Sequence, residues 1–176
     1  VPVKDNPRMF ALESDDRGII FVAAAFEFGY VQPDIMGGYE YISLSERLDS
    51  TENILYVYSI LIENNIVHFL SPKKIYKYDI QNDELSVVDI NSMGVTDAHR
   101  LVKIGDKMII ADRSTGFLEY DGDTVKLLPN SDLVKSKFYT VLLPYSDNEI
   151  LVTPYGERAF LYDLRNGEIN YSFINA

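Results

Sequence analysis

The sequence contains no cysteine and no tryptophan, and it has only two histidines. Without cysteine the chain has no disulfide bond, no thiolate nucleophile and no cysteine-based zinc site, although this absence does not identify a cellular compartment. His68 and His99 both lie in apolar segments and belong to no His-x-His or Glu-x-x-His pattern. We therefore expect both to be structural histidines, and we expect neither a metal site nor a cofactor.

Positive charge is also scarce, with 16 Lys and Arg residues against 27 Asp and Glu residues and a net charge of −11. The longest basic run is the pair Lys73-Lys74. Proteins that bind phosphate backbones need a basic surface, so we do not expect direct binding of nucleic acid. The apolar runs are strand-sized, well below the roughly 20 residues of a membrane helix. A membrane link is therefore expected only through segments outside this chain.

Motifs of the common enzyme classes are missing. The sequence has no Gly-x-Ser-x-Gly nucleophile motif and no Gly-x-x-x-x-Gly-Lys phosphate loop. Asp15-Asp16 and Asp121-Gly122-Asp123 place carboxylates close together, but neither continues with the alternating oxygen ligands of an EF-hand loop. Tight turns explain both clusters. A pair of glycosidase carboxylates cannot be singled out among 27 acids, so we expect no enzyme.

What the chain does have is 13 Tyr and 9 Phe residues in a sequence of 176 that is 47% hydrophobic. Tyrosine, phenylalanine, isoleucine and valine suit a pleated, half-buried surface. The composition therefore predicts a folded all-β protein with a substantial core.

An internal repeat specifies the kind of β fold. Phe160–Asp163 resembles Phe117–Asp121 and Ile75–Asp79, and the first copy, Tyr30–Asp34, has Pro33 where the others have tyrosine. The aspartates that end these segments follow one another at steps of 45, 42 and 42 residues. A four-stranded propeller blade has a period of about 40–45 residues.

Each copy contains four short apolar or alternating segments separated by polar turns. We expect strands at 9–12, 57–62, 101–104 and 139–143, then at 19–23, 66–70, 108–111 and 150–152, then before each repeated aspartate, and last at 39–44, 85–90, 125–128 and 169–174. Short helical turns are expected within 46–53 and 131–137. The prediction is an all-β, propeller-type repeat of four consecutive four-stranded antiparallel blades, at about 8–48, 54–91, 97–130 and 137–175, in one partial propeller domain over 1–176. A β-sandwich or barrel is the alternative, but it does not predict a unit of nearly constant length.

The predicted propeller has no spare strand with which to close into a ring. Pro2 and Pro7 make the segment before the first expected strand a poor ladder partner, and the last copy already has its own fourth strand. The chain also begins at Val1 rather than methionine, so we expect a piece of a longer protein. Open blades need closure or capping. We therefore expect an arc that self-associates through its open blade edges.

The ordered motifs resemble the sensor propellers of Bacteroidetes two-component regulators, hybrid ones included, and of related propeller-containing transcriptional regulators. In that family the propellers are extracytoplasmic, and a β-sandwich, a membrane helix and a kinase or helix-turn-helix module follow; many members respond to carbohydrate. The resemblance implies a non-enzymatic, periplasmic ligand sensor with any kinase activity outside this chain. A protein-interaction scaffold is the alternative, and a carbohydrate-active enzyme is third. The segments that carry the resemblance are 6–8, 27–30 with 33–34, 74–78, 116–120, and 143–145 running into 150–152.

Loops between the second and third strands of each copy differ from one another and are expected at one rim of the propeller. Function tends to sit on such loops over a rigid scaffold, and an oligosaccharide is the expected ligand. An ordinary solvated rim is the alternative. Tyr78, Tyr120 and Tyr162, which recur inside strands, are expected to pack between blades. The candidate ligand-binding residues are Glu27, Phe28, Lys73, Lys74, Arg113, Ser114, Tyr155, Glu157 and Arg158.

Overall fold

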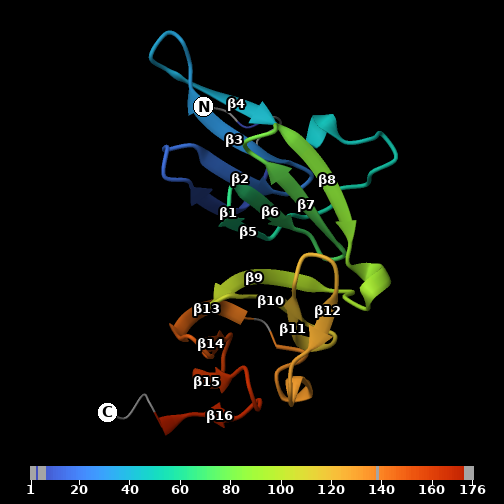
Figure 1. The fold of residues 1–176 in the computed structure, drawn as a ribbon, viewed down its shortest axis with the longest axis vertical. Coiled ribbons are helices and arrows are strands. Elements are labelled where there is room, and N and C mark those ends of the chain that lie inside the picture. The colour runs from blue at the N-terminus through green and yellow to red at the C-terminus, as the bar shows by residue number, and fades with distance from the viewer. Residues whose placement is uncertain (1–2, 4–6, 138, 173–176) are drawn as a thin grey trace. The chain divides into compact units, whose positions relative to one another are not determined.

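The structure is a computed structural model that describes residues 3, 7–137 and 139–172 (Figure 1). These residues form four antiparallel four-stranded sheets, each with its strands in chain order. The predicted all-β repeat of four-stranded antiparallel sheets is therefore confirmed. The strands are β1 Met9–Ser14, β2 Ile20–Ala24, β3 Phe28–Pro33 and β4 Tyr39–Ser43; β5 Ser59–Glu63, β6 Ile66–Leu70, β7 Lys74–Asp79 and β8 Glu84–Asp89; β9 Ala98–Ile104, β10 Lys107–Asp112, β11 Gly116–Tyr120 and β12 Val125–Leu127; β13 Tyr139–Ser146, β14 Glu149–Pro154, β15 Phe160–Asp163 and β16 Ile169–Asn170.

The chain divides into two compact units, Val1–Asp89 and Ile90–Ala176. The first unit contains the sheets β1–β4 and β5–β8, and the second contains β9–β12 and β13–β16. Each unit thus holds two of the four sequence repeats. The single propeller domain expected from the sequence stays a prediction.

The repeated aspartate that marks the period closes the turn after the third strand of each sheet. One carboxylate oxygen of Asp79 accepts the amides of Gln81 and Asn82 at 2.8 and 3.1 Å. Such a side chain replaces a backbone partner and holds the chain in a tight turn. The repeat is therefore a repeat of turn chemistry. In the other three turns the aspartate likewise accepts the amide two residues further on: Asp34 accepts those of Met36 and Gly38, Asp121 those of Asp123 and Thr124, and Asp163 that of Arg165.

The core of the first unit lies between its two sheets. Phe28 on β3 is fully buried and stacks on Tyr76 of β7, with ring centroids 4.8 Å apart and an angle of 23° between the rings. Tyr30 stacks in the same way on Tyr78 at 5.8 Å. Offset aromatic stacking adds about 0.5–1.5 kcal/mol per pair beyond the area that it buries. These pairs fix how the two sheets pack against each other.

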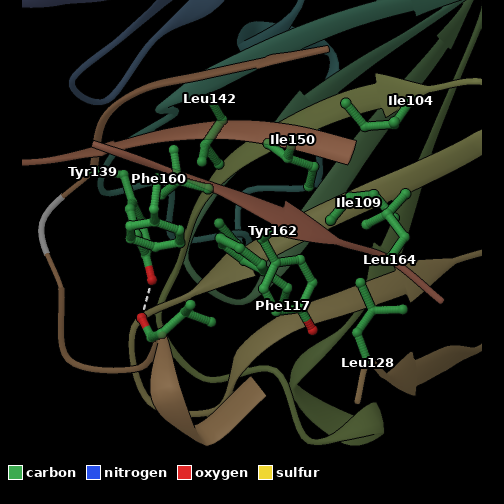
Figure 2. Close-up of a cluster of buried hydrophobic side chains, with 13 residues drawn as sticks. Ile104, Ile109, Phe117, Leu128, Tyr139, Leu142, Ile150, Phe160, Tyr162 and Leu164 are labelled. Atoms are coloured by element: carbon green, nitrogen blue, oxygen red, sulfur yellow. Dashed lines mark hydrogen bonds between the residues drawn. The ribbon is translucent and has the colours of Figure 1, made fainter. Parts of the chain in front are cut away.

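The core of the second unit is built the same way (Figure 2). Phe117 of β11 meets Tyr162 of β15 edge to face, with centroids 5.1 Å apart. The Tyr139 hydroxyl donates a hydrogen bond to the Val134 carbonyl, drawn as a dashed line in Figure 2. Tyr78 and Tyr162 therefore pack between sheets as predicted, and Tyr120 is also buried.

Three local features differ from the sequence prediction. The last strand ends at Asn170, because the Asn170 carboxamide oxygen accepts the amide and hydroxyl of Ser172 at 2.8 and 2.6 Å and turns the chain. Residues 173 and 174 of the predicted strand, and most of the proline-containing segment 1–8, lie outside the described residues. The helical turns expected within 46–53 and 131–137 are 3₁₀ turns at Ser45–Arg47 and Ser131–Leu133, and a third turn occupies Asn91–Met93. In the described part of the chain, no helix is long and apolar enough to cross a membrane.

Candidate functional site

In the first unit, the segment between the two sheets draws the two predicted rim turns together. The amide of Phe26, in the β2–β3 turn, donates to the Leu55 carbonyl at 2.9 Å. Three residues earlier on the same segment, the Glu52 carboxylate forms an ion pair with Lys74 at the start of β7. The turns of Glu27 and Lys74 are therefore joined through residues 52–55. Lys73, beside Lys74, is exposed.

Glu27 is a buried carboxylate, with only 6% of the residue exposed. Its Oε1 atom accepts hydrogen bonds from three hydroxyls, those of Tyr41, Ser43 and Ser45, at 3.0, 2.9 and 2.6 Å. Burial and the neighbouring Glu27 charge raise the pKa of Tyr41. A carboxylate that accepts several hydrogen bonds is compensated for the loss of water. Glu27 is thus held in place rather than free to reorient.

Phe28 is wrongly placed by the sequence prediction. Its side chain is fully buried against Phe69 and Tyr76, so it cannot contact a ligand at the rim. Successive residues of a strand point to opposite faces, and Phe28 at the start of β3 faces the core. The exposed aromatic residue of this turn is Phe26, two positions earlier.

Phe26 occupies an unusual backbone conformation. Its φ angle is 64°, in the left-handed region, while its side chain is 62% exposed. For a residue with a bulky side chain this conformation costs roughly 1–2 kcal/mol. Strain of this kind persists where the surroundings over-determine it, and it clusters at binding and catalytic sites. An exposed, strained phenylalanine on a rim turn is therefore a candidate for ligand contact.

Phe26 belongs to an aromatic platform, which we define as Phe10, Phe26, Tyr56 and Tyr58. Tyr56 is 40% exposed and lies at the centre of the group. Its ring centroid is 5.9 Å from Phe26, 5.8 Å from Phe10 and 5.6 Å from Tyr58, on which it stacks at 13°. The Arg8 guanidinium lies over the Phe10 ring at 5.3 Å. This platform was not predicted from the sequence, although the alternation Tyr56-Val57-Tyr58 just before a strand is a visible signal.

An acidic hollow of about 310 Å³ adjoins the platform and shares Phe26 with it. This volume is at the lower end of the range for small-molecule sites. Its walls offer carboxylate, amide and hydroxyl groups, and so they can accept and donate hydrogen bonds to a polar ligand. The hollow is lined by Phe26, Glu27, Ser45, Glu46, Glu52, Asn53 and Ile54.

In the second unit, the predicted residues Arg113 and Ser114 directly follow a buried aspartate, Asp112. Asp112 is fully buried and accepts the amides of Thr96 and Asp97 on one oxygen, and those of Ser114 and Thr115 on the other, at 2.6–2.9 Å. Arg113 pairs with the Asp97 carboxylate at 2.7 Å. This turn is therefore a rigid structural element, and Ser114 contributes its exposed side chain to the surface.

The remaining predicted residues lie on the β14–β15 turn. Tyr155 is 82% exposed, and Glu157 forms an ion pair with Lys137. Arg158 donates to the Tyr171 carbonyl at 3.0 Å and lies over that tyrosine's ring. The neighbouring Ser136 amide donates to the Arg113 carbonyl at 2.7 Å, so residues 136–137 join this turn to the Arg113 turn. The second unit thus has its own compact rim, with one projecting tyrosine.

Neither histidine belongs to a metal site in the described part of the chain, where no cluster of three or more His, Asp or Glu residues could hold an ion. Burial lowers the pKa of His68 to about 4 and that of His99 to about 4. Both imidazoles are therefore uncharged at pH 7. The His99 ring stacks on Tyr139 with ring centroids 5.3 Å apart.

No protein-family model and no curated protein sequence matches the chain. Solved structures are similar at low identity. The extracellular domain of the one-component system BT4673 from B. thetaiotaomicron has a TM-score of 0.69 over 97% of this chain, at 14% identity. A structure described as the extracellular domain of the hybrid two-component system BT4673 gives 0.54 over 98%, at 12% identity. The computationally designed Ika4 protein gives 0.61 over 93%, at 15% identity.

The chain spans only 23% and 28% of the two BT4673 chains, but 96% of the Ika4 chain. Identity this low carries information on the fold alone. Together with the four repeated sheets, the likeness identifies the architecture as propeller-type.

Proposed function

We propose that this chain is a non-enzymatic, ligand-sensing propeller segment in the extracytoplasmic part of a signalling receptor, of the Bacteroidetes one-component or hybrid two-component kind. The proposal is supported by a likeness to extracellular domains of such systems that extends over nearly the whole chain. The sequence resemblance at the motifs 27–30, 74–78 and 116–120 supports the same assignment. Any kinase or DNA-binding activity belongs to other parts of the receptor, and a periplasmic location follows from the same assignment.

The observation that carries the ligand proposal is the aromatic platform beside the acidic hollow. Tyrosine and phenylalanine rings present a flat apolar surface at low entropic cost, and a pyranose ring offers a matching face of C–H groups. Carboxylate oxygens of Glu46 and Glu52 and the Asn53 carboxamide in the adjoining hollow suit the hydroxyls of such a ligand. We therefore propose an uncharged or amino-bearing oligosaccharide, which the acidic lining tolerates better than an anionic one.

The test is a calorimetric and thermal-shift titration of the chain with neutral, amino-bearing and uronic oligosaccharides. A ligand at about 100 times its dissociation constant should add roughly 2.7 kcal/mol of stability. We expect Tyr56→Ala to weaken binding at least tenfold. Tyr39→Ala, which removes another exposed tyrosine of the same unit, should leave binding unchanged.

Two other outcomes would redirect the proposal. Loss of binding in Tyr155→Ala but not in Tyr56→Ala would move the ligand to the rim of the second unit. Absence of binding to every glycan, with the fold intact, would contradict the carbohydrate assignment and favour a scaffold for protein contacts.

A further inference from the structure

The interface between the two sheets of the second unit shows what one blade presents to the next. On β9–β12, the face toward β13–β16 contains a cross-strand row of Val102, Ile109 and Glu119. Ile109 is fully buried in the core cluster that β13–β16 completes, and Val102 packs against that cluster. Figure 2 shows Leu142, Ile150, Phe160 and Tyr162 directed into the same cluster. This face is therefore covered by the following sheet.

The last sheet repeats this row on its opposite face. Leu143 pairs with Leu151, and Leu151 pairs with Leu161. By strand register Leu151 corresponds to Ile109 and Leu161 corresponds to Glu119, so the row is more apolar than its covered counterpart. Leu161 is buried, but Leu143 is 49% exposed, and Val141 in the next row is 36% exposed. We call this face of β13–β16 the trailing face.

The first sheet presents the complementary kind of face. Its core-facing side packs on β5–β8, and its opposite side has cross-strand rows in which Leu12 pairs with Val22 and Ile20 pairs with Val31. Leu12 is 57% exposed and Ile20 is 39% exposed. We call this face of β1–β4 the leading face. Both faces expose apolar side chains, Leu12 and Ile20 on one and Val141 and Leu143 on the other, and this exposure costs free energy in proportion to the area.

We infer that the trailing face of one copy binds the leading face of a second copy, head to tail. Within each unit a leading-type face packs against a trailing-type face, and among the described residues β1–β4 carries a leading face and β13–β16 a trailing face, each with an exposed leucine. A second copy offers both surfaces in the geometry that a blade repeat already uses. Because the two faces differ, the contact is heterologous, so each copy offers one face to each of two neighbours. This inference does not depend on the ligand proposal.

Sedimentation velocity of the purified chain over a range of concentrations tests the association. We expect concentration-dependent self-association of the native chain, and monomer for both Leu12→Asp and Leu143→Asp. Leu133→Asp replaces a similarly exposed leucine on a 3₁₀ turn that belongs to neither face, so it should associate like the native chain. Circular dichroism melting confirms that each variant is folded, which is expected because both target leucines are about half exposed.

Mixing the two monomeric variants provides the decisive measurement. The intact trailing face of Leu12→Asp can bind the intact leading face of Leu143→Asp, so mixing should restore dimers. A contact between two trailing faces predicts instead that Leu12→Asp dimerises by itself and that Leu143→Asp does not enter dimers on mixing. A native chain that stays monomeric at high concentration would also overturn the inference.

Discussion

The amide of Phe26 donates a 2.9 Å hydrogen bond to the carbonyl of Leu55. This bond ties the β2–β3 turn to the segment that enters the next sheet, and the Val57 amide adds a second tie to the Ala24 carbonyl at 3.0 Å. Together they hold Phe26 at a positive φ angle and bring its ring beside Tyr56. The aromatic platform therefore depends on backbone contacts between two segments that are distant in the sequence.

Replacing Phe26 with glycine should separate stability from binding. Glycine adopts positive φ angles at no steric cost, so Phe26→Gly should leave the free energy of unfolding unchanged or raise it by up to about 1 kcal/mol. The same change removes an exposed ring of the platform, and it should weaken glycan binding at least tenfold. Urea unfolding and calorimetry measure the two effects. A marked loss of stability would show that the ring has a structural role.

Phe28→Ala is the matched opposite case. Its ring is fully buried between Phe69 and Tyr76, so truncation leaves a cavity that the two sheets cannot fill. We expect a loss of about 3–5 kcal/mol in the free energy of unfolding. Urea denaturation measures it, and a loss below about 1 kcal/mol would contradict the assignment of Phe28 to the core.

Asp112→Ala should destabilise the second unit strongly. The substitution leaves the amides of Thr96, Asp97, Ser114 and Thr115 without their acceptor, and unsatisfied buried donors cost about 1–3 kcal/mol each. We expect a loss of at least about 3 kcal/mol, read from chemical unfolding. The control, Asp106→Ala, removes an exposed aspartate of the β9–β10 turn and should change stability by less than about 0.5 kcal/mol.

Gly29→Ala should disturb the packing around Tyr41. A Cβ atom at this position would collide with the Ile42 carbonyl oxygen and would lie 2.7 Å from the Tyr41 hydroxyl. Backbone on the neighbouring strand cannot move away without breaking the β3–β4 ladder, so we expect a loss of about 1–3 kcal/mol. Thermal unfolding measures the loss. Gly37→Ala, at an open position with positive φ, provides a control that is strained without any collision.

Stability should fall as the pH drops from about 6.5 to about 4. Burial lowers the pKa of His99 to about 4, and the unfolded chain binds a proton there at about 6.5, so protonation favours unfolding in this window. The same holds for His68. Each histidine should account for roughly 3 kcal/mol across the window.

His99→Phe tests this assignment, because phenylalanine can keep the stacking on Tyr139 without titrating. Its unfolding free energy should depend less steeply on pH between 6.5 and 4 than that of the native chain. Asp79, Asp121 and Asp163 have lowered pKa values, so their contribution is lost as the pH falls through about 4 and below, and it is common to both proteins. An unchanged slope in His99→Phe would contradict the role of His99.

The sequence by itself determined the β class, the period and the turn that produces the period. Asp34, Asp79, Asp121 and Asp163 each close a turn through their own side chain, so this information is local and visible in the chain. The alternation of apolar residues likewise marked the strands to within a few residues, because the side chains of a strand alternate between two faces.

Only the tertiary structure decided which rim residues are available to a ligand. Phe26 and Phe28 are both aromatic and two positions apart, yet a left-handed turn exposes the first while the strand register buries the second. Lys74 is engaged by Glu52, and Tyr56 meets Phe26 through a connecting segment that lies outside the repeated strands. Exposure and contact arise from the packing of distant segments, and no local pattern of the chain specifies them.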